Sequence, residues 1–98
     1  MYLQKINLKN KYALVTGAGK GLGRACSLAM AEAGATILAL SRTQSDLDKL
    51  ESDIKKIKGK IVKIQCDVMN YEDLKNKLEK IKIIDILVNN AGTNIPET

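Results

Sequence analysis

Short apolar runs alternate with helical hydrophobic patterns along this chain, and that alternation restricts the fold more than any other feature. Runs of strand length stand at residues 13–15, 36–40, 61–66 and 84–88, and apolar residues recur at helical spacing between them. Parallel strands need a crossover connection, so strands that alternate with helices indicate an α/β fold. The order β-α-β-α-β-α-β with right-handed crossovers predicts the N-terminal half of a Rossmann-type doubly wound parallel sheet, with strand order 3-2-1-4.

Local signals place the ends of the three expected helices. Gly34 stands where a helix-terminating glycine is expected after the first helix. Ser45, with Asp48 three residues on as its partner, is predicted to cap the second helix, and Asn70 to cap the third. The predicted packed face of the first helix carries Leu22, Ala25, Cys26, Ala29, Met30 and Ala33.

The predicted strands differ in how many polar residues they carry. Residues 36–40 are almost wholly apolar, which suits a strand in the interior of a parallel sheet. Residues 61–66 alternate instead, with Lys63 and Gln65 polar. That alternation is typical of an edge strand that is partly wet on one face.

Length and charge exclude several other classes of protein. Ninety-eight residues suffice for one domain at most, which we take to be a partial nucleotide-binding domain spanning residues 1–98. The net charge is +5, but three Tyr are the only aromatic residues and no DNA-binding motif is present. A solvated Lys-rich surface is therefore favoured over a nucleic-acid patch, and we expect no nucleic-acid partner.

Cysteine and histidine usage argues against a metal site. The chain has no His, and Cys26 and Cys66 lie forty residues apart, which excludes a Cys/His zinc site and gives no disulfide framework. We expect two buried, reduced thiols, as in a cytosolic protein. The sequence shows no signal-peptide run and no apolar stretch of membrane-spanning length, so we expect a cytoplasmic location and no membrane partner.

A glycine-rich turn, residues 16–23, joins the first strand to the first helix. A helix N-terminus offers free N–H donors and a partial positive charge to a phosphate, and glycine lets the ligand approach the backbone closely. The spacing is G-x-x-x-G-x-G at Gly17, Gly21 and Gly23, and not the commoner G-x-G-x-x-G. Such a turn can also be only a turn, but its strand-turn-helix context favours dinucleotide binding.

Three motifs together make the chain similar to the short-chain dehydrogenase/reductase family. They are TGxxxGxG at residues 16–23, Asp67-Val68 after the third strand, and Asn89-Asn90-Ala91-Gly92 after the fourth. The resemblance runs from about Lys9 to Gly92. It implies that the adenine is held by Asp67 and Val68, and that Asn90, Ala91 and Gly92 run beside the adenosine ribose. The turn residues it implies in cofactor binding are Gly17, Ala18, Gly19, Lys20, Gly21, Leu22 and Gly23. It further suggests that Asn89 ties strands together and that Thr16 bonds within the turn.

The end of the second strand indicates which nucleotide is preferred. Ser41-Arg42 stands where NAD-specific sites carry a carboxylate for the ribose 2′-hydroxyl. A guanidinium grips a 2′-phosphate with paired hydrogen bonds, and Lys20 lies within reach of the same group. Arg42 and Lys20 can alternatively be plain surface charges, and Asp46 and Asp48 are interpreted as first-turn helix residues. We predict NADP(H) over NAD(H).

The family's catalytic residues have no counterpart in these 98 residues. The family uses a Ser and a Y-x-x-x-K pair, whose Lys lowers the pKa of the Tyr. Tyr71 and Lys75 satisfy that spacing, but they stand before the fourth strand, whereas the family's pair follows a fifth. We therefore reject Tyr71 and Lys75 as catalytic residues. We expect residues 1–98 to be the cofactor-binding half of a longer enzyme, and we predict that they are inactive alone.

The resemblance also suggests what the parent protein does. It implies NAD(P)-dependent hydride transfer between a nicotinamide and a small-molecule carbonyl or alcohol, in a homodimer or homotetramer. Gly19-Lys20-Gly21 and residues 41–47 look most like carbonyl and L-xylulose reductases, and residues 89–94 resemble sugar-acid dehydrogenases and 3-oxoacyl carrier-protein reductases. The alternative is a non-catalytic dinucleotide-binding or regulatory protein of the same fold, or an inactive fragment.

Overall fold

Seven elements follow one another in the alternating order that the sequence predicts. The computed structural model describes residues 6–90. Its elements are β1 (Tyr12–Thr16), α1 (Gly21–Glu32), β2 (Thr36–Ser41), α2 (Gln44–Lys56), β3 (Lys60–Gln65), α3 (Tyr71–Glu79) and β4 (Ile86–Asn89). No helix in the described part of the chain is long and apolar enough to cross a membrane.

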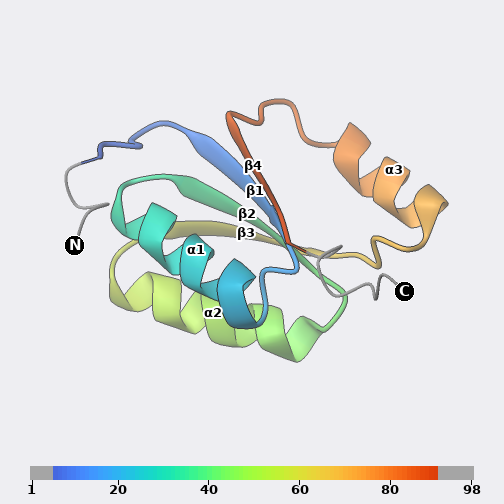
Figure 1. The fold of residues 1–98 in the computed structure, drawn as a ribbon, viewed down its shortest axis with the longest axis horizontal. Coiled ribbons are helices and arrows are strands. Elements are labelled where there is room, and N and C mark those ends of the chain that lie inside the picture. Colours follow the sequence, from blue (N-terminus) through green and yellow to red (C-terminus); the bar gives the residue numbers. More distant parts are fainter. Residues whose placement is uncertain (1–5, 91–98) are drawn as a thin grey trace.

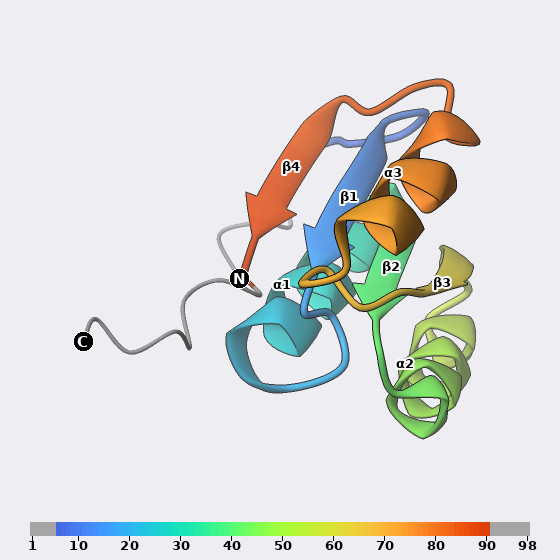
Figure 2. The same ribbon diagram turned by 90° about the vertical axis from the view of Figure 1, so that its right-hand side faces the viewer.

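The four strands form one parallel sheet with the order β3-β2-β1-β4, which confirms the predicted half of a doubly wound fold (Figure 1). Helices α1 and α2 cover one face, and α3 lies over the other (Figure 2). Val15 of β1 pairs with Ala39 of β2 on one side and with Val88 of β4 on the other. All four strands therefore end at the same edge of the sheet.

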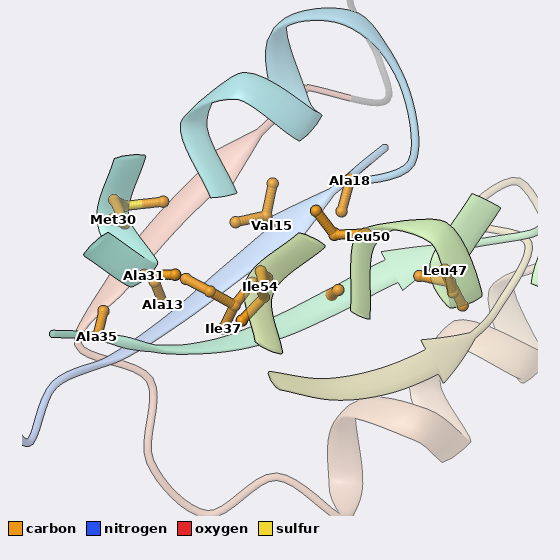
Figure 3. Close-up of a cluster of buried hydrophobic side chains, with 11 residues drawn as sticks. Ala13, Val15, Ala18, Met30, Ala31, Ala35, Ile37, Leu47, Leu50 and Ile54 are labelled. Atoms are coloured by element: carbon orange, nitrogen blue, oxygen red, sulfur yellow. The ribbon is translucent and has the colours of Figure 1, made fainter. Parts of the chain in front are cut away.

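The larger core lies between the sheet and the pair α1–α2 (Figure 3). Ile37 from the sheet and Leu47, Leu50 and Ile54 from α2 are fully buried. Small residues such as Ala31 let the helices approach the strands closely, which high packing density requires. A smaller core under α3 holds Leu14, Leu38, Leu40 and Cys66.

The burial of the strands follows their order in the sheet. In β2, residues Ile37 to Leu40 are all buried, as predicted for an interior strand. The outer strand β3 is exposed or half-buried throughout, and Lys63 forms ion pairs with Asp48 and Glu51 of α2 at 2.9 Å each. Charged side chains on an edge strand discourage pairing with other chains. The edge-strand prediction is thus confirmed.

Two of the three predicted helix ends are confirmed and one is wrong. Gly34 follows α1 with φ of 109°, a conformation that favours glycine. Asn70 Oδ1 accepts a hydrogen bond from the N–H of Asp73 and so caps α3. The predicted cap Ser45 lies instead inside α2, which begins at Gln44 after Thr43. Ser41 Oγ accepts the Thr43 N–H at 3.2 Å, so the chain enters this helix directly from the end of β2.

The packed face of α1 differs from the predicted one. Gly23, Ser27, Met30 and Ala31 are its buried residues, whereas the Leu22 side chain is 68% exposed. The glycine-rich turn sets the rotation of the helix, because Gly23 packs directly on the carbonyl of Gly17. Ser27 tolerates burial since its hydroxyl donates to the Gly23 carbonyl at 2.8 Å.

The two thiols also differ in burial. Cys66 is buried as expected, but Cys26 is only half-buried, because it lies beside the packed face of α1 and not at its centre. Neither is disulfide-bonded.

Candidate functional site

A cleft of about 540 Å³ opens where β1, β2 and β3 end. In open α/β sheets, ligands bind outside the carboxyl ends of the strands, where the connections diverge to opposite faces. The volume lies within the range of small-molecule and cofactor sites. The cleft is lined by Gly17, Gly19, Lys20, Leu40, Ser41, Arg42, Thr43, Asp46, Cys66, Asp67, Val68, Met69 and Asn90.

The first wall of the cleft is the glycine-rich turn, which is built from backbone. Gly17 and Gly21 have φ of 63° and 54°, in the left-handed region where side chains are strained. A Cβ on Gly23 would lie 2.2 Å from the Gly17 carbonyl oxygen, so this position excludes any side chain whether or not a ligand is bound. The two ends of the turn are therefore closely packed against each other.

The start of α1 is suited to an anion. The first N–H groups of a helix have no acceptor within the helix, and here no side chain caps them. Lys20 occupies the N-cap position with extended backbone, and the first turn carries no acidic residue. The partial positive charge of the helix N-terminus is thus left available to a phosphate.

Hydrogen bonds between β1 and β4 hold the turn in place. The hydroxyl of Thr16 accepts the N–H of Asn90 at 2.9 Å and lies 3.0 Å from Asn89 Oδ1. Asn90 Nδ2 donates to the Gly17 carbonyl at 3.4 Å. Thr16 therefore links two strands, where the sequence suggested a bond within the turn. Asn89 ties the strands together, as the sequence suggested.

The second wall carries the positive charge. Arg42 follows β2 and forms no ion pair with any residue in the described range. Its carbonyl accepts a hydrogen bond from Gln65 Nε2 at 3.2 Å, which joins the ends of β2 and β3. Lys20 approaches from the glycine-rich turn, with its Nζ 3.9 Å from Asp46 Oδ2.

Asp46 is a part of the site that the sequence interpretation missed. Its side chain is only 15% exposed and lies against Gly19, where an added Cβ would come within 2.6 Å of Asp46 Cβ. Gly19 thus lets the turn pack on the first turn of α2. Asp46 does lie in that first turn, as predicted, but Asp48 lies beyond it and pairs with Lys63.

The third wall follows β3. The N–H of Asp67 donates to Asp73 Oδ2 at 3.2 Å, and Asp67 Oδ1 accepts the N–H of Met69 at 2.9 Å. The ammonium of Lys77, through its hydrogen bond with the carboxylate, lowers the pKa of Asp73. Burial, with the nearby Asp73, raises the pKa of the Cys66 thiol, which therefore stays protonated at neutral pH.

The family sequence pattern described as short chain dehydrogenase matches residues 11–98. The chain belongs to the short-chain dehydrogenase family. L-xylulose reductase of Mesocricetus auratus is 43% identical over 87 residues, which are 89% of this chain and 34% of the relative. The chain thus spans about a third of the length of the curated relatives that it matches first.

Two solved structures that are similar to this chain contain a bound nicotinamide dinucleotide. A provisionally named NAD(P)-dependent gluconate 5-dehydrogenase of Beutenbergia cavernae, with NADP bound at low occupancy, is 32% identical with a TM-score of 0.74, over 83% of this chain and 33% of that one. NAD⁺-bound xylitol dehydrogenase is 33% identical with a TM-score of 0.81, over 87% and 34%. The predicted likeness to L-xylulose reductases and sugar-acid dehydrogenases is confirmed.

The structure brings eight predicted site residues to the cleft. They are Gly17, Gly19, Lys20, Ser41, Arg42, Asp67, Val68 and Asn90. Of the others, Ala18 is buried beneath the turn, Gly21 and Leu22 face solvent at the start of α1, and Gly23 packs inside the turn. Ala91 and Gly92 lie outside the described residues. Leu40, Thr43, Cys66 and Met69 line the cleft without having been singled out.

The rejected Tyr-Lys pair lies on α3 and does not line the cleft. Tyr71 is 70% exposed, and Lys75 is also exposed. Within residues 6–90 no cluster of three or more His, Cys, Asp or Glu side chains is placed to hold a metal ion.

Proposed function

We propose that this chain is the NADP(H)-binding half of a short-chain oxidoreductase that interconverts a carbonyl and an alcohol by hydride transfer. The observation that carries the proposal is the convergence of three walls on one cleft. A backbone turn suited to a diphosphate, a pair of cations and an adenine-side carboxylate all line it. NAD(P)H-dependent chemistry in the whole protein rests on its membership of the family.

The diphosphate is proposed to lie over the glycine-rich turn. The uncapped N–H groups at the start of α1 supply donors, and their positive potential favours an anion. Gly17, Gly19 and Lys20 line the cleft at this point, and the turn carries no carboxylate of its own. Asn90 donates a hydrogen bond to the Gly17 carbonyl and so links the turn to the end of β4.

The 2′-phosphate of NADP(H) is proposed to lie between Arg42 and Lys20. Arg42 and Lys20 line the cleft from the end of β2 and from the turn, and Ser41 lies at the same end of β2. No carboxylate ends β2. Asp46 is the acidic residue lining this part of the cleft, and Lys20 partly neutralises it. A guanidinium without another partner favours the phosphorylated ribose.

The described residues bind and orient the cofactor, and they do not carry out proton transfer. The nicotinamide, when bound, would supply or accept the hydride. Asp67 is proposed to hold the adenine amino group at the far end of the cleft, beside Val68. The Ser and Tyr-x-x-x-Lys residues would come from the remainder of the parent protein, which we propose to be a cytoplasmic homodimer or homotetramer acting on a small-molecule carbonyl or alcohol.

Titration of NADPH and NADH, followed by cofactor fluorescence, tests the preference in the protein as its gene encodes it. We expect NADPH to bind about 10- to 100-fold more tightly, the size of a charge-assisted paired hydrogen bond. Arg42→Asp should reverse the order, because a carboxylate repels the phosphate and accepts the ribose hydroxyl. Lys49→Asp, the same kind of charge change on an exposed part of α2, is the matched control and should leave the order unchanged.

Two results would count against the proposal. Binding of neither nucleotide by the wild-type protein would remove the cofactor site altogether. Tight NADPH binding without turnover of any carbonyl or alcohol would favour the alternative of a non-catalytic dinucleotide-binding protein. Residues 1–98 alone are expected to show no turnover.

A further inference from the structure

An ion pair on α3, between Asp73 and Lys77, is hydrogen-bonded to the backbone at the end of β3, beside the cleft. Lys77 Nζ donates to the Gln65 carbonyl at 2.7 Å and to Asp73 Oδ1 at 3.1 Å. The other oxygen of Asp73 accepts the N–H of Asp67 at 3.2 Å. The pair thus joins α3 to two successive points of the chain that leaves β3.

The segment held in this way leads into the third wall of the cleft. The carbonyl of Asp67 accepts the N–H of Asn70 at 2.9 Å, and its Oδ1 accepts the N–H of Met69. Together with the bond to Asp73, these contacts fix the backbone and one side-chain oxygen of Asp67. Its Oδ2 accepts no hydrogen bond from any described residue, and Asp67 lines the cleft.

We propose that Asp73 is a positioning residue for the cofactor: through the Asp67 N–H it aims the Asp67 carboxylate at the adenine amino group. The inference rests on the proposed function, because it assumes that a nicotinamide dinucleotide occupies the cleft. Asp73 does not line this cleft, but it lines a smaller hollow beside it together with Asp67 and Lys77, and the effect proposed for it acts through Asp67.

The position of Asp73 in α3 supports a role beyond helix capping. It lies in the first turn, where a carboxylate commonly returns to the N–H of the N-cap residue. Here the N-cap residue is Asn70, and its N–H is already taken by the Asp67 carbonyl. Asp73 reaches past the cap to Asp67 instead. Its negative charge is balanced by Lys77, which itself holds the Gln65 carbonyl, so the pair acts as one unit.

A ligand pair that differs only at the adenine amino group tests the inference. The purine analogue of the cofactor carries a hydrogen atom in place of that amino group, so it has no N–H there for a carboxylate to accept. The wild-type protein, as its gene encodes it, should bind NADPH about tenfold more tightly than the reduced purine analogue, the size of one charge-assisted hydrogen bond. Asp73→Ala should narrow that ratio to about twofold.

Conservative and matched variants separate positioning from a general structural effect. Asp73→Asn keeps an oxygen for the Asp67 N–H and should retain most of the discrimination. Glu72→Ala removes an exposed carboxylate from the same turn of α3 and should keep the wild-type ratio. If Asp73→Ala does not fold, Lys77→Met takes its place, with an intermediate ratio expected since Asp73 loses its partner.

The outcomes distinguish the inference from the proposed function. An unchanged ratio in folded Asp73→Ala, or in Lys77→Met where that variant replaces it, would overturn the inference and leave NADPH binding standing. Equal binding of the two ligands by the wild-type protein would also overturn it, since Asp67 would then not read the amino group. If the wild-type protein binds neither ligand, both the inference and the proposed function fall.

Discussion

The cleft has two kinds of wall, and they are built on different principles. The wall after β1 is backbone, packed so tightly that Gly23 lies against the Gly17 carbonyl. The walls after β2 and β3 are side chains joined across elements, as in the bond from Gln65 to the Arg42 carbonyl. In the proposed function, the backbone wall provides a fixed shape for the diphosphate that all dinucleotides share. The side-chain walls would then distinguish one nucleotide from another, and a single substitution can change them.

The largest expected effect comes from filling the backbone wall. Gly23→Ala places a Cβ 2.2 Å from a carbonyl oxygen, so the turn or α1 must move. We expect a loss of about 3 kcal/mol of unfolding free energy, at the upper end for overpacking, together with loss of NADPH binding. Thermal unfolding and fluorescence titration measure the two effects.

Gly21→Ala is the control for that prediction. An added Cβ at Gly21 meets nothing within 4 Å, but its φ of 54° is strained for a side chain. The expected cost is only about 1 kcal/mol. If the two variants are equally stable, tight packing at Gly23 is not what requires glycine there.

This wall could be predicted from the sequence because its requirements are local. A turn of eight residues needs glycine at positions 17, 21 and 23. The strand before it and the helix after it can be predicted from their hydrophobic patterns. The parallel sheet and its order follow from the alternation and from the handedness of crossovers. Even here the rotation of α1 was predicted wrongly, because the contact of Gly23 with Gly17 sets it and the apolar pattern does not.

The side-chain walls could be predicted only in part. Arg42 and Asp67 follow strand ends, so their positions at the carboxyl edge were foreseeable. Asp46 and Asp73 were not. Asp46 depends on how the start of α2 approaches the distant glycine-rich turn, and Asp73 depends on how the first turn of α3 folds back on the N–H of Asp67, six residues earlier. The misplaced cap at Ser45 has a local origin: Ser41 already satisfies the N–H of Thr43, so the helix starts earlier than its sequence signal indicates.

A smaller effect is expected from loosening the join between the two side-chain walls. Gln65→Ala removes the hydrogen bond to the Arg42 carbonyl while leaving both cations in place. We expect the preference for NADPH over NADH to fall about fivefold, the size of one neutral hydrogen bond, with NADH affinity nearly unchanged. Paired titrations of the two cofactors measure the ratio.

Ser52→Ala, an exposed change on α2 away from the cleft, provides the baseline for that ratio. Equal weakening of NADPH and NADH by Gln65→Ala would show that the bond supports the whole cleft. The selective role of Gln65 at the 2′-phosphate end would then be wrong.

The smallest expected effect is on acid stability, and it concerns the side-chain walls alone. Lys77 holds the pKa of Asp73 below its ordinary value of 3.8, so the folded state binds this proton less readily than the unfolded state. The stabilising contribution is therefore fully present above pH 3.8 and is lost as the pH falls toward the lowered pKa. Asp73→Asn should remove that part of the pH dependence, so its unfolding free energy should decline less steeply than that of the wild type below pH 4.

Denaturant unfolding in steps from pH 6 to pH 3 measures the slopes. Asp48 and Glu51 also have lowered pKa values, through Lys63, so the variant should keep part of the acid sensitivity. Parallel slopes for wild type and variant would mean that the contact of Lys77 with Asp73 does not persist in solution, and that this wall of the cleft is looser than the backbone wall opposite.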